Sequence, residues 1–248
     1  MAQQVWLTES LRLTLFPLTA LKPGGQWWLK LTGELPIVHN ESPRQGIVHE
    51  EGPLDIAKLI LETQPFRIDC HYAPRDDQSP SEKTPQNVGT TEQAVPSFRL
   101  LLDKLLTFSD LPELSRIAFG VNLVSPVESR AVGYEAMSRY VSIKLDAQNS
   151  SDFLYQINRP RTIQAPINGL RINRLSRWSV MEFQIIQFQV GPQPKTLTTS
   201  GSSTAIRLEL DINTAPENSR TFGPRETSSV LPILIDFALE LAKKGDIP

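Results

Sequence analysis

Four segments of the chain alternate apolar with polar residues, and this alternation is the strongest constraint on the fold. In segment 205–213 every second residue is Ile or Leu, and the residues between them are Arg, Glu, Asp and Asn. Side chains two residues apart in a β-strand point to the same face of a sheet, so this segment has one apolar and one polar face. The pattern is typical of antiparallel sheets that face water on one side. The other three segments are 10–16, 26–35 and 66–72.

Further strands are predicted where short runs are rich in apolar and β-branched residues, at 58–62, 116–124, 153–157 and 180–190. Residues 191–204 are rich in Gly, Pro, Ser and Thr and separate two of the predicted strands. We therefore expect 180–190 and 205–213 to form a long hairpin. The pair Gly24–Gly25 after Pro23 predicts a turn between the first two strands.

The sequence also predicts three helices. The first, 98–108, follows Ser97, whose hydroxyl suits the N-cap position. The second, 127–143, has apolar residues spaced for one buried face. The third, about 230–244, carries Pro232 in its first turn and ends in two lysines before a glycine. Cations suit the negative end of the helix dipole, and glycine suits the position after a helix.

Together these elements predict an α+β fold, in which about three helices pack on a mainly antiparallel β-sheet. Segment 74–97 contains four prolines and no aromatic residue, which predicts a long Pro-rich connection that serves as a linker or a flap. It divides a β-rich N-terminal part, 1–73, from a mixed C-terminal part, 98–248. The two parts are either separate domains or one continuous domain.

The composition is that of an ordinary globular protein, since hydrophobic residues make up 40% and charged residues 21% of the chain. No stretch approaches the roughly 20 apolar residues of a membrane span, and the N-terminus does not resemble a signal peptide. These features predict a soluble, cytoplasmic protein with no membrane partner. The single cysteine, Cys70, excludes an intramolecular disulfide and a Cys-based zinc site.

The motifs that mark nucleotide-binding proteins and many enzymes are missing from the sequence. It has neither the Gly-rich loop of P-loop proteins nor that of dinucleotide-binding folds. His39, His49 and His71 match no metal-binding spacing. Glu209 and Asp211 share one polar strand face, where such carboxylates are usually just solvated. We therefore expect no catalytic residue, no metal and no cofactor. A pocket that joined His49 or His71 to these carboxylates and an arginine would instead indicate an enzyme without a local motif.

A cluster of five arginines is the one uneven feature of the charge distribution. Residues 153–181 contain no Asp, Glu or Lys, although the whole chain has a net charge of −2. A guanidinium group offers a planar fork of donors that fits a phosphate or a carboxylate. We therefore consider these arginines, with Trp178 beside them, candidates for binding an anion or a partner: Arg159, Arg161, Arg171, Arg174 and Arg177.

Two properties of this cluster stay open at the level of sequence. Segment 168–180 fits a helical turn, which would align three arginines, but its β-rich flanks favour a strand. The arginines could also pair with acidic residues of the chain itself, and such solvated pairs are common and individually weak. The acidic candidates are Asp146, Asp152, Glu182, Glu209 and Asp211.

The sequence supports three hypotheses for the function. The first is a non-enzymatic binding protein or accessory subunit that docks on a protein partner or self-associates, through strand edges and apolar helix faces. The second is an Arg-mediated binder of nucleic acid or another phosphate-bearing ligand. The third is an enzyme whose residues meet only in the fold.

Overall fold

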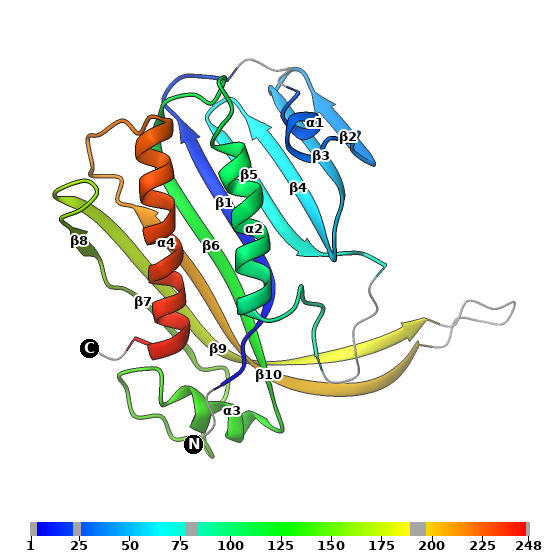
Figure 1. The fold of residues 1–248 in the computed structure, drawn as a ribbon. Helices are drawn as coiled ribbons and strands as arrows, with labels where there is room; N and C mark the ends of the chain where they lie inside the picture. The colour runs from blue at the N-terminus through cyan, green and yellow to red at the C-terminus, as the bar shows by residue number, and fades with distance from the viewer. Residues whose placement is uncertain (1–3, 22–25, 78–83, 189–196, 247–248) are drawn as a thin grey trace, which may run out of the picture.

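The computed structural model describes residues 4–21, 26–77, 84–188 and 197–246, and one antiparallel sheet of ten strands runs through them (Figure 1). The strand order is β2-β3-β4-β5-β1-β6-β10-β9-β7, and β8 also pairs with β9. The turn predicted at Gly24–Gly25 lies outside the described residues. The strands are β1 (Leu7–Pro17), β2 (Val38–Ser42), β3 (Ile47–Leu54), β4 (Ala57–Gln64), β5 (Arg67–Pro74), β6 (Leu114–Val127), β7 (Leu154–Asn158), β8 (Arg161–Ile163), β9 (Leu170–Phe188) and β10 (Leu197–Thr214).

The helices found in the described residues all pack on the same face of this sheet. The two long helices lie side by side across it (Figure 1). One short helix reaches the face through Trp28, which lies against Gly52 of β3, and the other through Gly133, which lies against Val180 of β9. No described helix is both long and apolar enough to cross a membrane. The helices are α1 (Trp27–Thr32), α2 (Thr91–Leu105), α3 (Arg130–Met137) and α4 (Pro224–Lys244).

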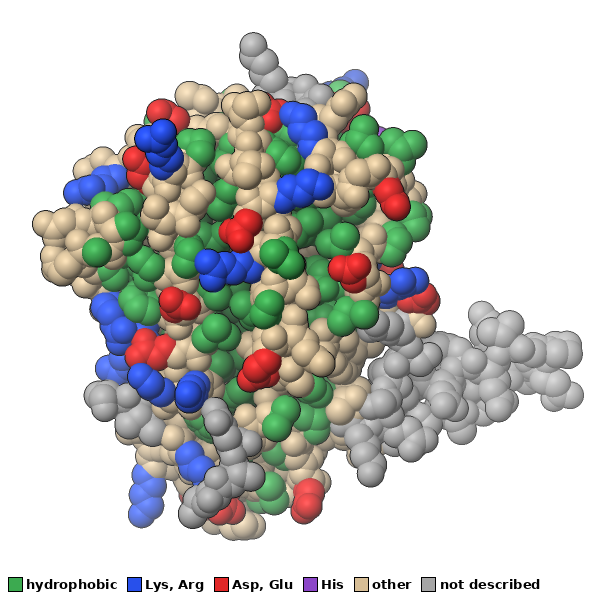
Figure 2. All heavy atoms as spheres, viewed as in Figure 1, with side chains coloured by type: hydrophobic (Ala, Val, Ile, Leu, Met, Phe, Trp, Pro, Cys, Tyr) green, Lys and Arg blue, Asp and Glu red, His purple; other side chains and the backbone are tan. Residues whose placement is uncertain are grey.

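The core lies between this face and the long helices. Leu11, Leu13 and Leu15 of β1 are fully buried there, and the side chain of Phe98 of α2 is 1% exposed. The outer surface of the helices instead carries interspersed charges of both signs, with hydrophobic side chains between them (Figure 2). The predicted arrangement of helices on a mainly antiparallel sheet is therefore confirmed. Because β1 pairs with β6 at the centre, parts 1–73 and 98–248 share one sheet.

The alternating segments form strands wherever one face is buried, with one exception. The predicted hairpin is confirmed, since β9 and β10 pair along their length: Ile172 faces Thr214 at one end, and Phe188 faces Leu197 at the other. Within segment 168–180, residues 170–180 belong to β9 and not to a helical turn. The exception is 26–35, which was predicted as a strand but contains α1. Trp27, Trp28 and Leu31 also suit the buried side of a helix, and Gly33 ends it with a φ of 83°.

The helix boundaries predicted from the sequence need correction. α2 begins at Thr91 rather than 98, because Thr90 and Gln93 form a capping box and Pro96 is accommodated inside the helix. α4 begins at Pro224, and Pro232 lies in its interior. Residues on both sides of Pro232 are buried, and this burial outweighs the roughly 3 kcal/mol that an interior proline costs. The helix predicted at 127–143 is shortened to α3, since Ser129 caps it at the start.

The two halves of the sheet have the same topology, which the sequence does not reveal. Each half begins with a central strand, continues with a short helix and a three-stranded meander, and ends with a long helix. β7 and β8 together correspond to β3, because they follow one register along β9: Asn158 faces Leu175 and Arg161 faces Ile172. β2 is an additional strand at the edge of the first half.

The register of the pairs shows which residues of the two halves correspond. At the centre Leu13 faces Phe119. Leu13 also faces Cys70 of β5, and Phe119 faces Ile212 of β10. A two-fold rotation about the central pair therefore places β5 on β10. The start of each central strand bridges the segment before the long helix of its half, as expected from this symmetry: Leu7–Thr90 and Leu114–Phe222.

Candidate functional site

The second face of the sheet, which we call the open face, carries no described helix. In β1, for example, Leu11 and Leu13 point to the core, while Arg12 and Thr14 point to the open face. Polar residues dominate this face on the central strands because they occupy the alternate positions of the apolar segments. They include Ser10, Arg12 and Thr14 on β1, Asp69 and His71 on β5, Asn122 on β6, and Arg207, Glu209, Asp211 and Asn213 on β10.

A hollow of about 320 Å³ lies in the middle of the open face, and we call it the central hollow. It joins His71 to two carboxylates and two arginines, which is the combination expected of an enzyme without a local motif. The hollow is built from β1, β5, β6, β7, β9 and β10, so its residues come from both halves of the chain. Its polar side chains are Ser10, Arg12, His71, Asn122, Gln156, Arg177, Glu209 and Asp211.

Arg12 extends across the floor of the central hollow. Its cross-strand neighbours are His71 on β5 and Gly120 on β6, and Gly120 in turn faces Asp211 on β10. A Cβ atom on Gly120 would lie 3.5 Å from Nε of Arg12 and 3.6 Å from its Nη2, so the guanidinium group lies directly over the glycine. Within the described ranges, no carboxylate lies within ion-pair distance of Arg12.

Asp211 differs sharply from its counterpart in the first half, Asp69. Asp69 is 3% exposed and accepts a hydrogen bond of 2.6 Å from Thr14 Oγ1. Arg67, two residues earlier on β5, also donates to both of its oxygens through Nε and Nη2. In the second half, glycine takes the position of Thr14 and Glu209 takes that of Arg67. Asp211 therefore lacks both partners.

The second half leaves a carboxylate available in the central hollow. Asp211 accepts one hydrogen bond, from Nδ2 of Asn213 at 3.0 Å, and no described cation lies within 4 Å of it. Glu209 is less available, because Arg207 lies 3.5 Å and Arg177 lies 3.9 Å from its carboxylate. The central hollow thus presents one unpaired guanidinium and one unpaired carboxylate to a ligand.

The environment of His71 disfavours its charged form. Burial lowers its pKa below the ordinary value; the charge of Asp69 opposes this effect and that of Arg12 adds to it. No carboxylate in the described part of the chain lies within ion-pair distance of His71, although Asp69 lies two residues away on the same strand face. The neutral ring can donate or accept a hydrogen bond, but no acid orients it as in a catalytic dyad.

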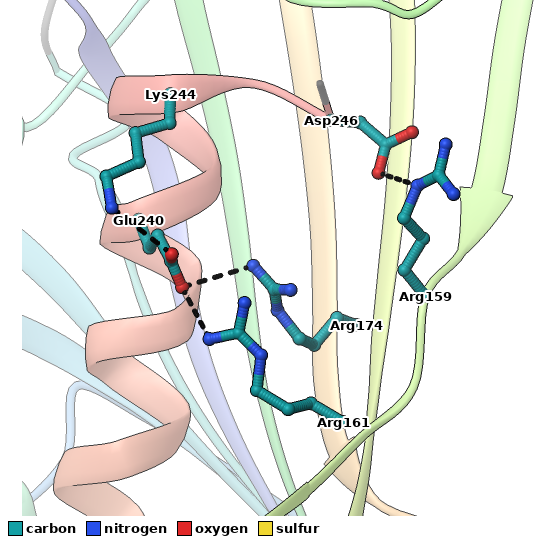
Figure 3. Close-up of polar contacts among 6 residues, drawn as sticks. All are labelled: Arg159, Arg161, Arg174, Glu240, Lys244 and Asp246. Atoms are coloured by element: carbon teal, nitrogen blue, oxygen red, sulfur yellow. Dashed lines mark hydrogen bonds and ion pairs between the residues drawn. The ribbon is translucent and has the colours of Figure 1, made fainter. Parts of the chain in front are cut away.

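The predicted arginine cluster is divided between the two faces of the sheet. On the helix side, Arg159 lies 2.6 Å from Asp246, while Arg161 and Arg174 lie 3.0 Å and 3.3 Å from Glu240 (Figure 3). The acids come from α4 and the residues after it, not from the nearby segments considered in the sequence. Burial lowers the pKa of Arg174, and the neighbouring Arg161 adds to this effect. The ion pairs of these three arginines connect α4 and the residue Asp246 after it to the sheet.

The remaining members of the cluster have separate surroundings. Arg177 lines the central hollow and pairs with Glu209. Arg171 is exposed at the start of β9, where its backbone N–H donates to the side-chain oxygen of Asn218. Trp178 is fully buried and stacks on Tyr140 at 5.4 Å, so it belongs to the core and offers no platform to a ligand. The five arginines therefore do not converge on one surface.

Sequence reasoning missed Arg12, Ser10 and Asn122 as site residues. The only signal was their position on the polar faces of alternating segments, which many other residues share. No group of histidine, cysteine and carboxylate side chains that could hold a metal ion occurs in the described ranges. Comparisons of the chain with protein-family models, curated proteins and solved structures found no match.

Proposed function

We propose that the chain is a binding protein that holds a small polar ligand in the central hollow. The observation that carries this proposal is the pair of unpaired opposite charges, Arg12 and Asp211, on either side of Gly120. A half-buried charge without a partner is costly, and a ligand that supplies the partner recovers that cost. The volume of about 320 Å³ falls at the lower end of the range typical of small-molecule sites.

The arrangement supports a ligand with two different polar ends. A carboxylate or phosphate group suits Arg12, and a hydroxyl or ammonium group suits Asp211. The two residues are separated by two strand spacings, or roughly 10 Å between their backbones. Ser10, Asn122 and the neutral His71 add neutral hydrogen-bonding groups between and beside the charges. A ligand of a few to about a dozen heavy atoms would span the site.

Thermal unfolding with a panel of metabolites tests this function. The panel covers amino acids, hydroxy acids and sugar phosphates, which all combine an anionic group with a donor. A ligand at 100 times its Kd is expected to stabilise the fold by about 2.7 kcal/mol, or roughly 5–10 °C for a chain of this size. The Asp211→Asn variant should lose most of this shift. No stabilisation by any compound, or an equal shift in the variant, would contradict the proposal.

Self-association is a second candidate, supported by the edge strand β2. Leu35 and Ile37, just before this strand, are 80% and 75% exposed, and no strand of the described residues pairs with the outer edge of β2. A second copy related by a two-fold axis at Asn40 would place His39 opposite Glu41 in both directions. The two side chains can therefore form a hydrogen bond on each side of the axis, which suits a continuous sheet across two copies.

Light scattering coupled to size exclusion checks this second candidate. We expect a concentration-dependent dimer in the unmodified chain. Glu41→Lys should shift it toward monomer by removing the acceptor that faces His39, and the double variant His39→Glu/Glu41→Lys should restore it through opposite charges. A monomer at every concentration, or a dimer indifferent to Glu41→Lys, would exclude pairing through β2.

A further inference from the structure

A second hollow, also of about 320 Å³, lies where β1 ends, β6 begins and the loop between β10 and α4 passes. We call it the terminal hollow. It shares no lining residue with the central hollow. Two arginines line it, and none of its lining residues is an acid. In contrast, the arginines on the helix side of the sheet form ion pairs with acidic residues. The charge of the terminal hollow is therefore positive, whereas that of the central hollow is balanced.

Arg116 is the inner cation of the terminal hollow. It faces Phe16 directly across β1 and β6, and its guanidinium lies 5.3 Å from the centre of that ring. This distance is that of a cation–π contact, which attracts the guanidinium to the ring without neutralising its charge. Nε of Arg116 is buried and has no hydrogen-bond partner in the described structure, and no carboxylate described there lies within 4 Å of the group.

Arg220 is the outer cation and comes from the loop before α4. Its Nη2 donates to the backbone oxygen of Asn168 at 3.2 Å, which positions the side chain without neutralising it. Its other N–H groups have no partner among the described residues, and no ion pair forms there. Ser219 and Thr221, its neighbours in the chain, also line the terminal hollow. The terminal hollow thus combines two uncompensated guanidinium forks with neutral donors.

We infer that the terminal hollow binds a phosphate group of a small molecule. Two planar forks match the tetrahedral oxygens of phosphate in bidentate fashion, and hydroxyl groups satisfy the remaining oxygens. No carboxylate lines the terminal hollow, so an anion there meets no negative side chain of the lining. Arg171, one of the arginines singled out in the sequence, is linked to this hollow through Asn218, whose side-chain oxygen accepts from its backbone.

Calorimetric titration of the full chain tests the inference, with inorganic phosphate and glycerol 3-phosphate as probes and acetate as the reference anion. We expect saturable binding of at least one phosphate and weaker binding of acetate. If glycerol 3-phosphate binds more tightly than inorganic phosphate, the ligand is a phosphate ester rather than the free ion. Arg220→Gln, an exposed position, should weaken binding about tenfold or more, as the loss of a charge-assisted hydrogen bond predicts. Arg116→Gln should do the same.

Two control variants separate this site from its surroundings. Arg225→Gln removes an exposed arginine from the first turn of α4, outside the hollow, and should leave binding unchanged. Arg12→Gln reports on the alternative site, because Arg12 lies in the central hollow. No saturable binding of either phosphate, or an equal loss in Arg225→Gln, would overturn the inference. Loss of binding in Arg12→Gln but not in Arg220→Gln would overturn it as well and assign the anion to the central hollow.

Discussion

Replacing Arg12 with glutamine is expected to weaken ligand binding in the central hollow by roughly 10- to 150-fold. This corresponds to about 1.5–3 kcal/mol, the usual contribution of a hydrogen bond to a charged group. The stability of the free protein should hardly change, because Arg12 has no ion pair with any described residue that would be broken. Binding is measured by calorimetry with the compound that gives the largest thermal shift, and stability by urea unfolding.

Two further variants make this prediction specific. Arg12→Lys keeps the charge but loses the planar fork, so its affinity should fall between those of the wild type and Arg12→Gln. Arg75→Gln removes a more distant arginine, which pairs with Asp77, and should leave the affinity unchanged. If Arg12→Gln bound as tightly as the wild type, the anionic end of the ligand would have to lie elsewhere.

Replacing Gly245 with alanine is expected to destabilise the fold by about 3–5 kcal/mol. Gly245 follows α4 with φ 75° and ψ −167°, a conformation that is essentially restricted to glycine. A Cβ atom there would also lie 2.3 Å from the backbone oxygen of Tyr140, so the backbone would have to move. The turn is important because it directs Asp246 toward Tyr155 and Arg159, which both donate to its carboxylate.

Gly33 provides a matched control for this effect. It also follows a helix with a positive φ, of 83°, but a Cβ atom on it would meet nothing within 4 Å. Gly33→Ala should therefore cost only about 1 kcal/mol, for the left-handed backbone alone. Urea unfolding measures the free energy of unfolding of both variants, from the shift in the unfolding midpoint when the slope with urea concentration stays constant. Equal losses in the two variants would show that the contact with Tyr140 does not constrain the turn.

The strands were the most predictable part of the fold. In segments such as 205–213 burial of one face imposes a period of two on adjacent residues, and no other structure explains that pattern as well. The segment at Trp27 was mispredicted because a short run with two adjacent tryptophans suits both a helix and a strand. The start of α2 was placed too late because Ser97 was taken as the N-cap, whereas the capping residues Thr90 and Gln93 determine it.

The central hollow was much harder to predict than the strands that form it. Arg12, His71 and Asp211 lie on β1, β5 and β10, and only the pairing register brings them together. Local patterns indicate which face a residue occupies but not which residue lies beside it on the next strand. The arginine cluster illustrates the same limit, since its main partners, Glu240 and Asp246, are distant in sequence and are brought close by α4.

The repeated topology explains how a sheet without a catalytic motif acquires a distinct site. In the first half Thr14 and Arg67 satisfy Asp69 within the protein. In the second half glycine and Glu209 occupy those positions, so Asp211 keeps a free carboxylate and Arg12 has room to extend toward it. The site therefore arises from a difference between two otherwise equivalent places on the sheet.

A crystal structure of the chain with the most stabilising compound would test this conclusion most directly. The anionic group of the ligand should lie within hydrogen-bonding distance of the Arg12 guanidinium, and a hydroxyl or ammonium group should donate to Asp211. A ligand bound away from the central hollow, with Arg12 and Asp211 paired to each other or left in solvent, would contradict it.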